Sequence, residues 1–228
     1  MGWISSPRRA KFDAESPRPR RHPPSNHGRP QMTRRFSALA LAALLAAPAA
    51  LAAQAPTTVI LVRHAEKVAT DPRDPNPGLT PAGEQRARDL AQLLADKNVA
   101  GVITTQFART QLTGQPTANA AHVALDSISA GRDMNAHTAA IAARIRSAYA
   151  GKTVLVVGHS NTVPRIIAAL GGPALADICD SAYGNVFTLV IPASGEPRLT
   201  HGHYGAGDPN EAGCANGLRE AAPPANRF

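Results

Sequence analysis

Two histidines and two arginines of this sequence stand just beyond its most hydrophobic runs. Arg63 and His64 directly follow the aliphatic run at residues 59–62, and His159 directly follows a second run at residues 154–158. Arg109 comes shortly after a third run, at residues 99–104. Guanidinium groups bind phosphate oxygens bidentately, and an imidazole nitrogen without its proton is a nucleophile. These residue types therefore indicate a pocket for a tetrahedral anion in which a phosphoryl group could be transferred.

The four side chains meet only if the hydrophobic runs form neighbouring strands. Unbroken β-branched and aliphatic residues are typical of strands buried on both faces of a parallel sheet. In open α/β sheets, ligands bind outside the carboxyl ends of the strands. We therefore expect Arg63, His64, Arg109 and His159 at one edge of a sheet. Taken alone, the stretch from Arg63 to Glu66 fits a solvated strand end with a surface ion pair equally well.

The rest of the chain alternates predicted strands and helices. Thr80 is a good N-cap residue and Pro81 suits the first helical position, so a helix should begin there. Further helices are expected at residues 107–120, 135–149 and 163–170, and a closing hairpin at residues 186–191 and 198–204. Alternating elements of this kind predict an α/β fold, a three-layer α/β/α sandwich with a mostly parallel central sheet.

The N-terminal region divides at Met32. Two arginines, an apolar run and small residues follow it, which is the pattern of a secretory signal peptide over residues 32–52 with Ala53 as the first mature residue. Residues 1–31 look like a disordered basic extension or a mis-assigned start. We expect the globular domain at residues 53–206 and a flexible C-terminal tail at residues 207–228. This organisation predicts a periplasmic or secreted protein with no stable membrane insertion after signal cleavage.

The positive net charge of the whole chain lies mostly in residues 1–52, and the rest of the chain is nearly neutral. Residues 1–52 hold nine of the 24 Lys and Arg residues and two of the 16 acidic ones, which leaves 15 basic and 14 acidic residues. A nearly neutral body implies no nucleic-acid partner.

The remaining cysteines and histidines have simpler readings. Cys179 and Cys214 are the only cysteines, and export to an oxidising compartment favours a disulfide between them, with two unpaired thiols as the alternative. His201 and His203 share a strand face, but without a third ligand at suitable spacing we expect a solvated strand end and no metal site. His122 and His137 are expected at the surface or at helix edges.

Four motifs, in the same order along residues 57–204, resemble the histidine phosphatase superfamily, the phosphoglycerate mutase-like fold. The segment at residues 61–67 is similar to its R-H-G-E signature, and those at 79–83, 103–113 and 157–160 resemble its other conserved segments. Ala65 replaces the usual glycine, and Thr104-Thr105-Gln106-Phe107 replaces the usual S-S-P-L. His159 is followed by Ser160 in place of the aspartate of the phytase and acid phosphatase branch. The resemblance is therefore to the other, smaller branch.

The resemblance implies a role for each residue. His64 would carry the phosphoryl group, and Arg63, Arg109 and His159 would bind it, with Glu66 and Ser160 as neighbours that support them. Asp126 would be the proton donor to the leaving group, and Asp133 and Glu66 are alternatives. The implied activity is a metal-independent phosphatase without a cofactor, acting on a small phosphorylated substrate.

Three other functions stay open at this point. A phosphoglycerate mutase-like phosphotransferase would use the same residues. Ser160 also lies in a segment that resembles a nucleophile elbow, with Asp177 or Asp180 and His201 or His203 as partners of an α/β-hydrolase. That reading leaves Arg63, His64 and Arg109 unexplained. An anion-binding module would explain the arginines but not the paired histidines.

Overall fold

A six-stranded sheet forms the centre of residues 55–220, which are the residues that the computed structural model describes. Its order is β3-β2-β4-β1-β5-β6. The strands are β1 (Thr57–Arg63), β2 (Val99–Thr104), β3 (Leu125–Ser127), β4 (Thr153–Gly158), β5 (Asn185–Ile191) and β6 (Arg198–His203). The pairs among β1 to β4 are parallel, and the hairpin β5–β6 adds two antiparallel pairs. The expected mostly parallel sheet is confirmed.

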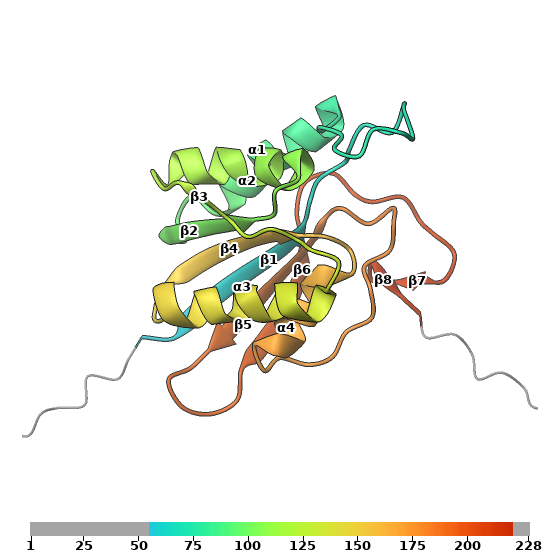
Figure 1. Cartoon of the computed structure of the whole chain (residues 1–228). Helices are drawn as coiled ribbons and strands as arrows, with labels where there is room; N and C mark the ends of the chain where they lie inside the picture. The colour runs from blue at the N-terminus through green and yellow to red at the C-terminus, as the bar shows by residue number, and fades with distance from the viewer. Residues whose placement is uncertain (1–54, 221–228) are drawn as a thin grey trace, which may run out of the picture. The chain divides into compact units, whose positions relative to one another are not determined.

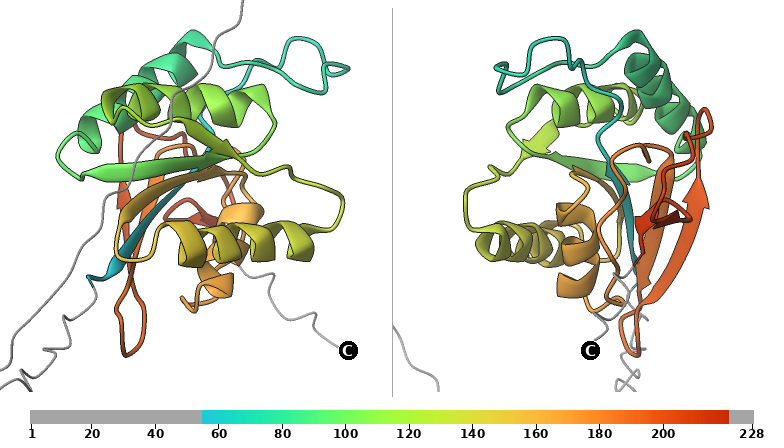
Figure 2. Two further views of the ribbon diagram at one scale, coloured as in Figure 1. Left: turned by 60° about the vertical axis from the view of Figure 1, so that its left-hand side comes forward. Right: turned by 90° about the vertical axis from the view of Figure 1, so that its right-hand side faces the viewer.

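Two helices cover each face of this sheet, as Figures 1 and 2 show. They are α1 (Pro81–Leu93), α2 (Ala108–Ala120), α3 (Met134–Ala148) and α4 (Thr162–Ala169). Successive side chains of β1 pack on opposite faces of the sheet. Ile60 packs in one core with Leu90 of α1, and Leu61 packs in the other core with Ile166 of α4. Because both faces are buried, the central positions of β1, residues 59–62, are all apolar. The three-layer sandwich is therefore confirmed.

The predicted helix boundaries have their expected physical causes. The side chain of Thr80 accepts a hydrogen bond from the Gly83 amide at 3.1 Å, and Pro81 occupies the first turn of α1. At the other end of the domain, α4 stops before Gly171, whose φ of +92° lies in the left-handed region that glycine adopts easily.

The segment from residue 207, which was expected to be a flexible tail, is folded up to residue 220. It forms a small hairpin of β7 (Cys214–Ala215) and β8 (Leu218–Arg219), and β8 bridges back to Ile178. The prediction of a tail from residue 207 missed these contacts because composition alone does not reveal the bonds of Asp208 and Glu211 to a distant loop. The folded domain therefore continues past residue 206.

The predicted signal peptide and the basic extension lie outside the described residues, as do residues 221–228. Within residues 55–220, none of the helices has the length and apolar character that crossing a membrane requires.

Candidate active site

His64 lies at the end of β1 with its ring fixed in one orientation. It is 4% exposed, and its Nδ1 lies 2.8 Å from the carbonyl oxygen of Ala65. A carbonyl only accepts hydrogen bonds, so Nδ1 carries the proton and Nε2 keeps a free lone pair. Burial first, and then the charges of Arg63, His159 and Arg109, lower the pKa of His64 to about 3. The imidazole is therefore neutral and nucleophilic at neutral pH.

His159 stands beside His64 because β1 and β4 are parallel neighbours. The register aligns Arg63 with Gly158, so the residue after each strand reaches the same level. The two imidazole centroids are 5.4 Å apart, and Nε2 of His159 lies 3.3 Å from Oγ1 of Thr105. Burial, followed by the charges of Arg109, His137 and Arg63, lowers the pKa of His159 to about 4.

Arg63 and Arg109 complete the cluster. Among the described residues, 55–220, neither of them forms a salt bridge. Arg63 is 5% exposed and stacks on the Tyr183 ring at 4.2 Å, whereas Arg109, on the first turn of α2, lies 4.3 Å from the Phe107 ring. The Nε of each is buried and has no partner in this part of the chain. Burial lowers the pKa of both guanidinium groups, and Arg63 adds to the shift at Arg109. Unpaired buried cations are unfavourable, so the cluster favours a bound anion.

Thr113 connects the nucleophile to the second arginine. The Ala65 amide donates to Oγ1 of Thr113 at 2.9 Å, and that hydroxyl donates to the Arg109 carbonyl at 2.7 Å. Thr105 likewise contacts His159 and the hydroxyl of Thr110, at 2.9 Å. No role was predicted for these threonines, although they lie in the motif at residues 103–113.

Glu66, two residues after His64, is hydrogen-bonded to helix α1. Its carboxylate accepts hydrogen bonds from the guanidinium of Arg86, at 2.8 Å for the closest pair, and Arg86 is only 4% exposed. A Cβ at Gly83 would collide with the Glu66 carbonyl, so glycine permits the close approach of α1. Glu66 therefore joins the segment after β1 to helix α1.

The structure does not bring Asp126 to the histidines. Asp126 pairs with Ile103, which pairs with Val156, three residues and so about 10 Å before His159 along the strands. Its carboxylate accepts a hydrogen bond from the Tyr149 hydroxyl at 3.1 Å and lies 3.6 Å from Nε of Arg144.

The two alternative carboxylates are also occupied elsewhere. Asp133 caps α3 by accepting from the Ala136 amide, and Glu66 is bound to Arg86. The sequence could not separate these acids because each lies close to a predicted strand or helix end.

The histidines of the serine-hydrolase alternative do not lie beside Ser160. Ser160 follows β4, whereas His201 and His203 belong to β6, and β1 and β5 lie between the two strands. His201 instead makes a 2.7 Å hydrogen bond from Nε2 to the Asn185 side chain. Asp180 pairs with Arg219.

His137 differs from its expected surface position. It is 4% exposed, and its Nδ1 lies 3.2 Å from the Ser129 carbonyl. Together with Arg109 and His159 it lines a pocket of about 200 Å³ beside the histidine pair. This position of His137 could not be predicted from the sequence, because a single histidine among the many small residues of a helix forms no recognisable motif. His122 is exposed, as expected.

Cys179 and Cys214 form the predicted disulfide, which joins residues 35 positions apart. It links the loop after α4 to β7.

Comparisons with known proteins agree with this arrangement. Residues 59–137 match the family model described as histidine phosphatase superfamily, branch 1. None of the curated proteins compared with the chain matches it.

Three solved structures share the fold. The protein histidine phosphatase SixA complexed with tungstate is 18% identical, with 64% of this chain and 96% of that chain covered and a TM-score of 0.51. A structure described as mycobacterial hydrolase 2 is 12% identical (69% and 94% covered, TM-score 0.50), and so is the mycobacterial glucosyl-3-phosphoglycerate phosphatase (63% and 97% covered, TM-score 0.50). At these identities the likeness shows the fold alone, and residues 59–137 are the part of the chain that is similar to the histidine phosphatase superfamily, branch 1.

Proposed function

We propose that this protein is a metal-independent phosphatase that hydrolyses a phosphate monoester through a phosphohistidine at His64. One observation carries the proposal: the buried His64, whose Nδ1 lies 2.8 Å from the Ala65 carbonyl oxygen, belongs to a cluster with two arginines that lack a salt bridge within residues 55–220. A phosphate group would supply the missing negative charge. The arginines supply the positive charge that the transferring oxygens require.

The reaction has two displacements at phosphorus. The Nε2 lone pair of His64 forms a bond to phosphorus while the ester oxygen leaves with the electron pair of the broken P–O bond and takes up a proton. Water then attacks the phosphohistidine, gives up a proton, and releases phosphate and neutral His64. Arg63, Arg109 and His159 hold the phosphoryl oxygens throughout, so the charge that develops in each transition state meets fixed donors.

The residues around His64 and His159 indicate which kind of leaving group the site favours. The three carboxylates expected as proton donors bind other groups: Asp126 contacts Tyr149 and Arg144, Asp133 caps α3, and Glu66 binds Arg86. A leaving group that needs little help from an acid fits such a site best. This observation favours a phosphoramidate, such as a phosphorylated histidine of a protein, as a second candidate substrate. The name of the structural relative, a protein histidine phosphatase, supports the same idea.

Hydrolysis is favoured over phosphotransfer to a second substrate. A mutase must keep water from the phosphohistidine and hold its product in a closed pocket. Here residues 71–76 beside the site are all exposed, and the pocket next to His159 measures only about 200 Å³.

The proposal is tested with a panel of phosphate monoesters and phosphoramidates in the presence of a metal chelator. The wild type should turn over at least one compound, His64→Asn should abolish turnover, and Ser160→Ala should retain it. Loss of activity on chelation would contradict metal independence. Activity that survives in His64→Asn but not in Ser160→Ala would support the serine-hydrolase alternative instead.

We also propose that the protein is exported to the periplasm or the medium. The signal-like residues 32–52 and the Cys179–Cys214 disulfide support this location. N-terminal sequencing of the exported protein should find Ala53 first. A mature protein that begins before Met32 would contradict the proposal.

A further inference from the structure

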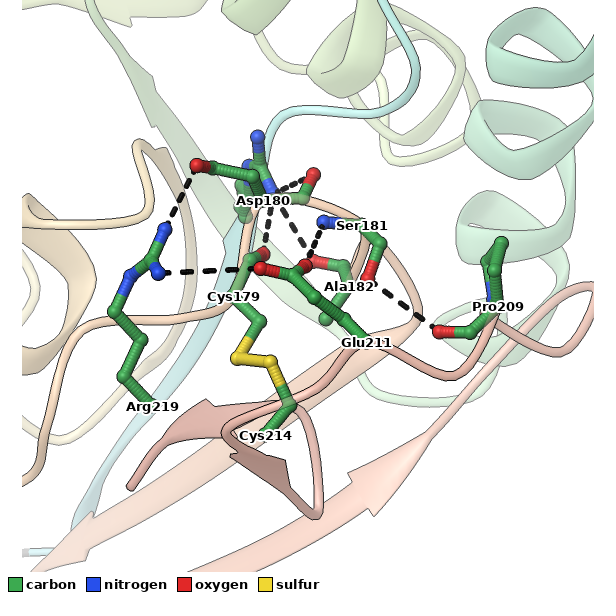
Figure 3. The surroundings of a disulfide bond; sticks show 9 residues. Cys179, Asp180, Ser181, Ala182, Pro209, Glu211, Cys214 and Arg219 are labelled. Carbon is green, nitrogen blue, oxygen red and sulfur yellow. Dashed lines mark hydrogen bonds and ion pairs between the residues drawn. A yellow bond between two sulfur atoms is a disulfide. The ribbon is translucent and has the colours of Figure 1, made fainter. Parts of the chain in front are cut away.

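Residues 208–219, here called the C-terminal clasp, bind along the outer side of residues 177–184, here called the Arg63 loop. Figure 3 shows the disulfide at the centre of this contact, with Glu211 and Arg219 on either side. The amide of Cys179 donates to the Gly217 carbonyl at 2.9 Å, and that of Ser181 donates to the Glu211 carboxylate at 2.8 Å.

Asp208 extends the clasp to the end of the loop. Its carboxylate accepts from the Tyr183 amide at 2.9 Å and from the Gly184 amide at 2.8 Å. At the other end of the clasp, the Arg219 guanidinium donates to the Asp180 carboxylate at 2.7 Å. The amides of the Arg63 loop are therefore tied to the clasp at nearly every second residue.

The opposite side of the same loop holds Arg63. Nη1 of Arg63 donates to the carbonyls of Cys179 at 2.7 Å and Asp180 at 2.8 Å, and Ala182 accepts more distantly, at 3.4 Å. The Tyr183 ring stacks on the guanidinium. The loop thus uses its amides for the clasp and its carbonyls for the arginine.

This arrangement leaves the rest of the guanidinium for a ligand. One terminal nitrogen is fully used by loop carbonyls, whereas the buried Nε has no partner among the described residues. Arginine binds phosphate through parallel N–H donors, so the direction of the plane decides whether both can reach the oxygens. The loop carbonyls set that direction.

We propose that the C-terminal clasp positions Arg63 for phosphate binding, and that the Cys179–Cys214 disulfide makes this positioning depend on the redox state. The inference rests on the proposed function, in which Arg63 binds the phosphoryl group. A dithiol reductant would give two electrons and two protons to the disulfide, form two thiols and itself become a disulfide. The Arg63 loop would then lose its covalent link to the clasp.

The test measures inorganic phosphate binding by calorimetry, together with KM and kcat for the best substrate, always in the presence of a metal chelator. The chelator matters because the Glu211 carboxylate lies close enough to both sulfurs for freed thiols to hold a metal ion. Dithiol treatment or Cys214→Ser should weaken phosphate binding and raise KM by about tenfold, the size expected for loss of well-placed charged hydrogen bonds, with a smaller effect on kcat. Reoxidation should restore the treated wild type, and Asn210→Ala, in the clasp but without a side-chain bond to the loop, should bind phosphate normally.

A double-mutant cycle separates positioning from general damage to the fold. If the disulfide acts through Arg63, then Cys214→Ser should weaken phosphate binding no further in an Arg63→Ala background. Equal, additive losses in both backgrounds would overturn the inference, and so would unchanged binding in folded Cys214→Ser. An oxidised wild type that neither binds phosphate nor hydrolyses any compound would instead overturn the proposed function itself.

Discussion

At the scale of single residues, the site is defined by neutral histidines among unpaired cations. Burial and the neighbouring arginines act in the same direction on His64 and His159, since both disfavour the protonated imidazole. The arginine charges remain because guanidinium groups keep their protons even when buried. The proposed nucleophile and the arginines proposed to bind phosphate therefore belong to one cluster.

The low pKa of His64 predicts a stability that falls in acid. In the unfolded chain the imidazole takes up a proton below about pH 6.5, whereas in the folded protein it stays neutral down to about pH 3. The unfolded state binds more protons in that window, so the free energy of unfolding should fall by up to about 1.4 kcal/mol per pH unit on this account. Urea unfolding at pH 7 and pH 5 measures it.

The control for this pH effect is His64→Asn, which does not titrate. The variant should lose less stability than the wild type between pH 7 and pH 5. An identical loss in both proteins would show that His64 is protonated in the folded state.

Asp126 gives a second prediction at this scale. Because its carboxylate binds Tyr149 and Arg144 away from the histidines, Asp126→Asn should change kcat/KM by less than about threefold, whereas removal of a general acid costs about 10²–10⁴-fold. The same change should lower the free energy of unfolding by roughly 1 kcal/mol. Steady-state kinetics and chemical unfolding of one protein preparation supply both values, and a hundredfold loss of kcat/KM would restore Asp126 as the proton donor.

At the scale of elements, the candidate site residues lie at the carboxyl ends of β1 and β4 and on the first turn of α2. Helix α1 contacts the segment that follows β1. The contact runs through Glu66 and the buried Arg86, whose guanidinium also donates to the carbonyls of Tyr204 and Ala206. This pair joins the loop after β1, helix α1 and the end of β6.

Glu66→Gln should therefore destabilise the protein by roughly 1.5–3 kcal/mol, because it removes the nearer of the two carboxylates that pair with the buried Arg86 and leaves only Asp208, at 3.4 Å. Asp71→Asn is the matched control: its ion pair with Arg73 is exposed to solvent, and its loss should leave the stability unchanged. Thermal and urea unfolding compare the two variants. Equal stabilities would mean that Arg86 finds other partners.

The elements could be predicted from the sequence where the signal was local. The apolar runs of β1 and β4, the Thr80 cap and the Gly171 stop all act within a few residues. The placement of His64 beside His159 followed from parallel pairing. The contacts of Tyr183 and His137 and the clasp could not be predicted, because each depends on a bond between residues far apart in the chain.

At the scale of the whole molecule, the fold places the candidate site at the carboxyl ends of the parallel strands β1 and β4. Residues 208–219 return to the site and contact the loop that holds Arg63, so the domain is closed by its own C-terminal segment. The Cys179–Cys214 disulfide therefore joins this C-terminal segment covalently to the loop that holds Arg63.

The most direct test of the central claim is to trap the phosphorylated enzyme. The protein is mixed with its best substrate, denatured within the first turnovers at alkaline pH to preserve phosphohistidine, digested, and searched by mass spectrometry for the phosphorylated residue. The account predicts a phosphoryl group on His64, and none there in His64→Asn. Turnover of substrate without phosphate on His64, or with phosphate on Ser160, would contradict it.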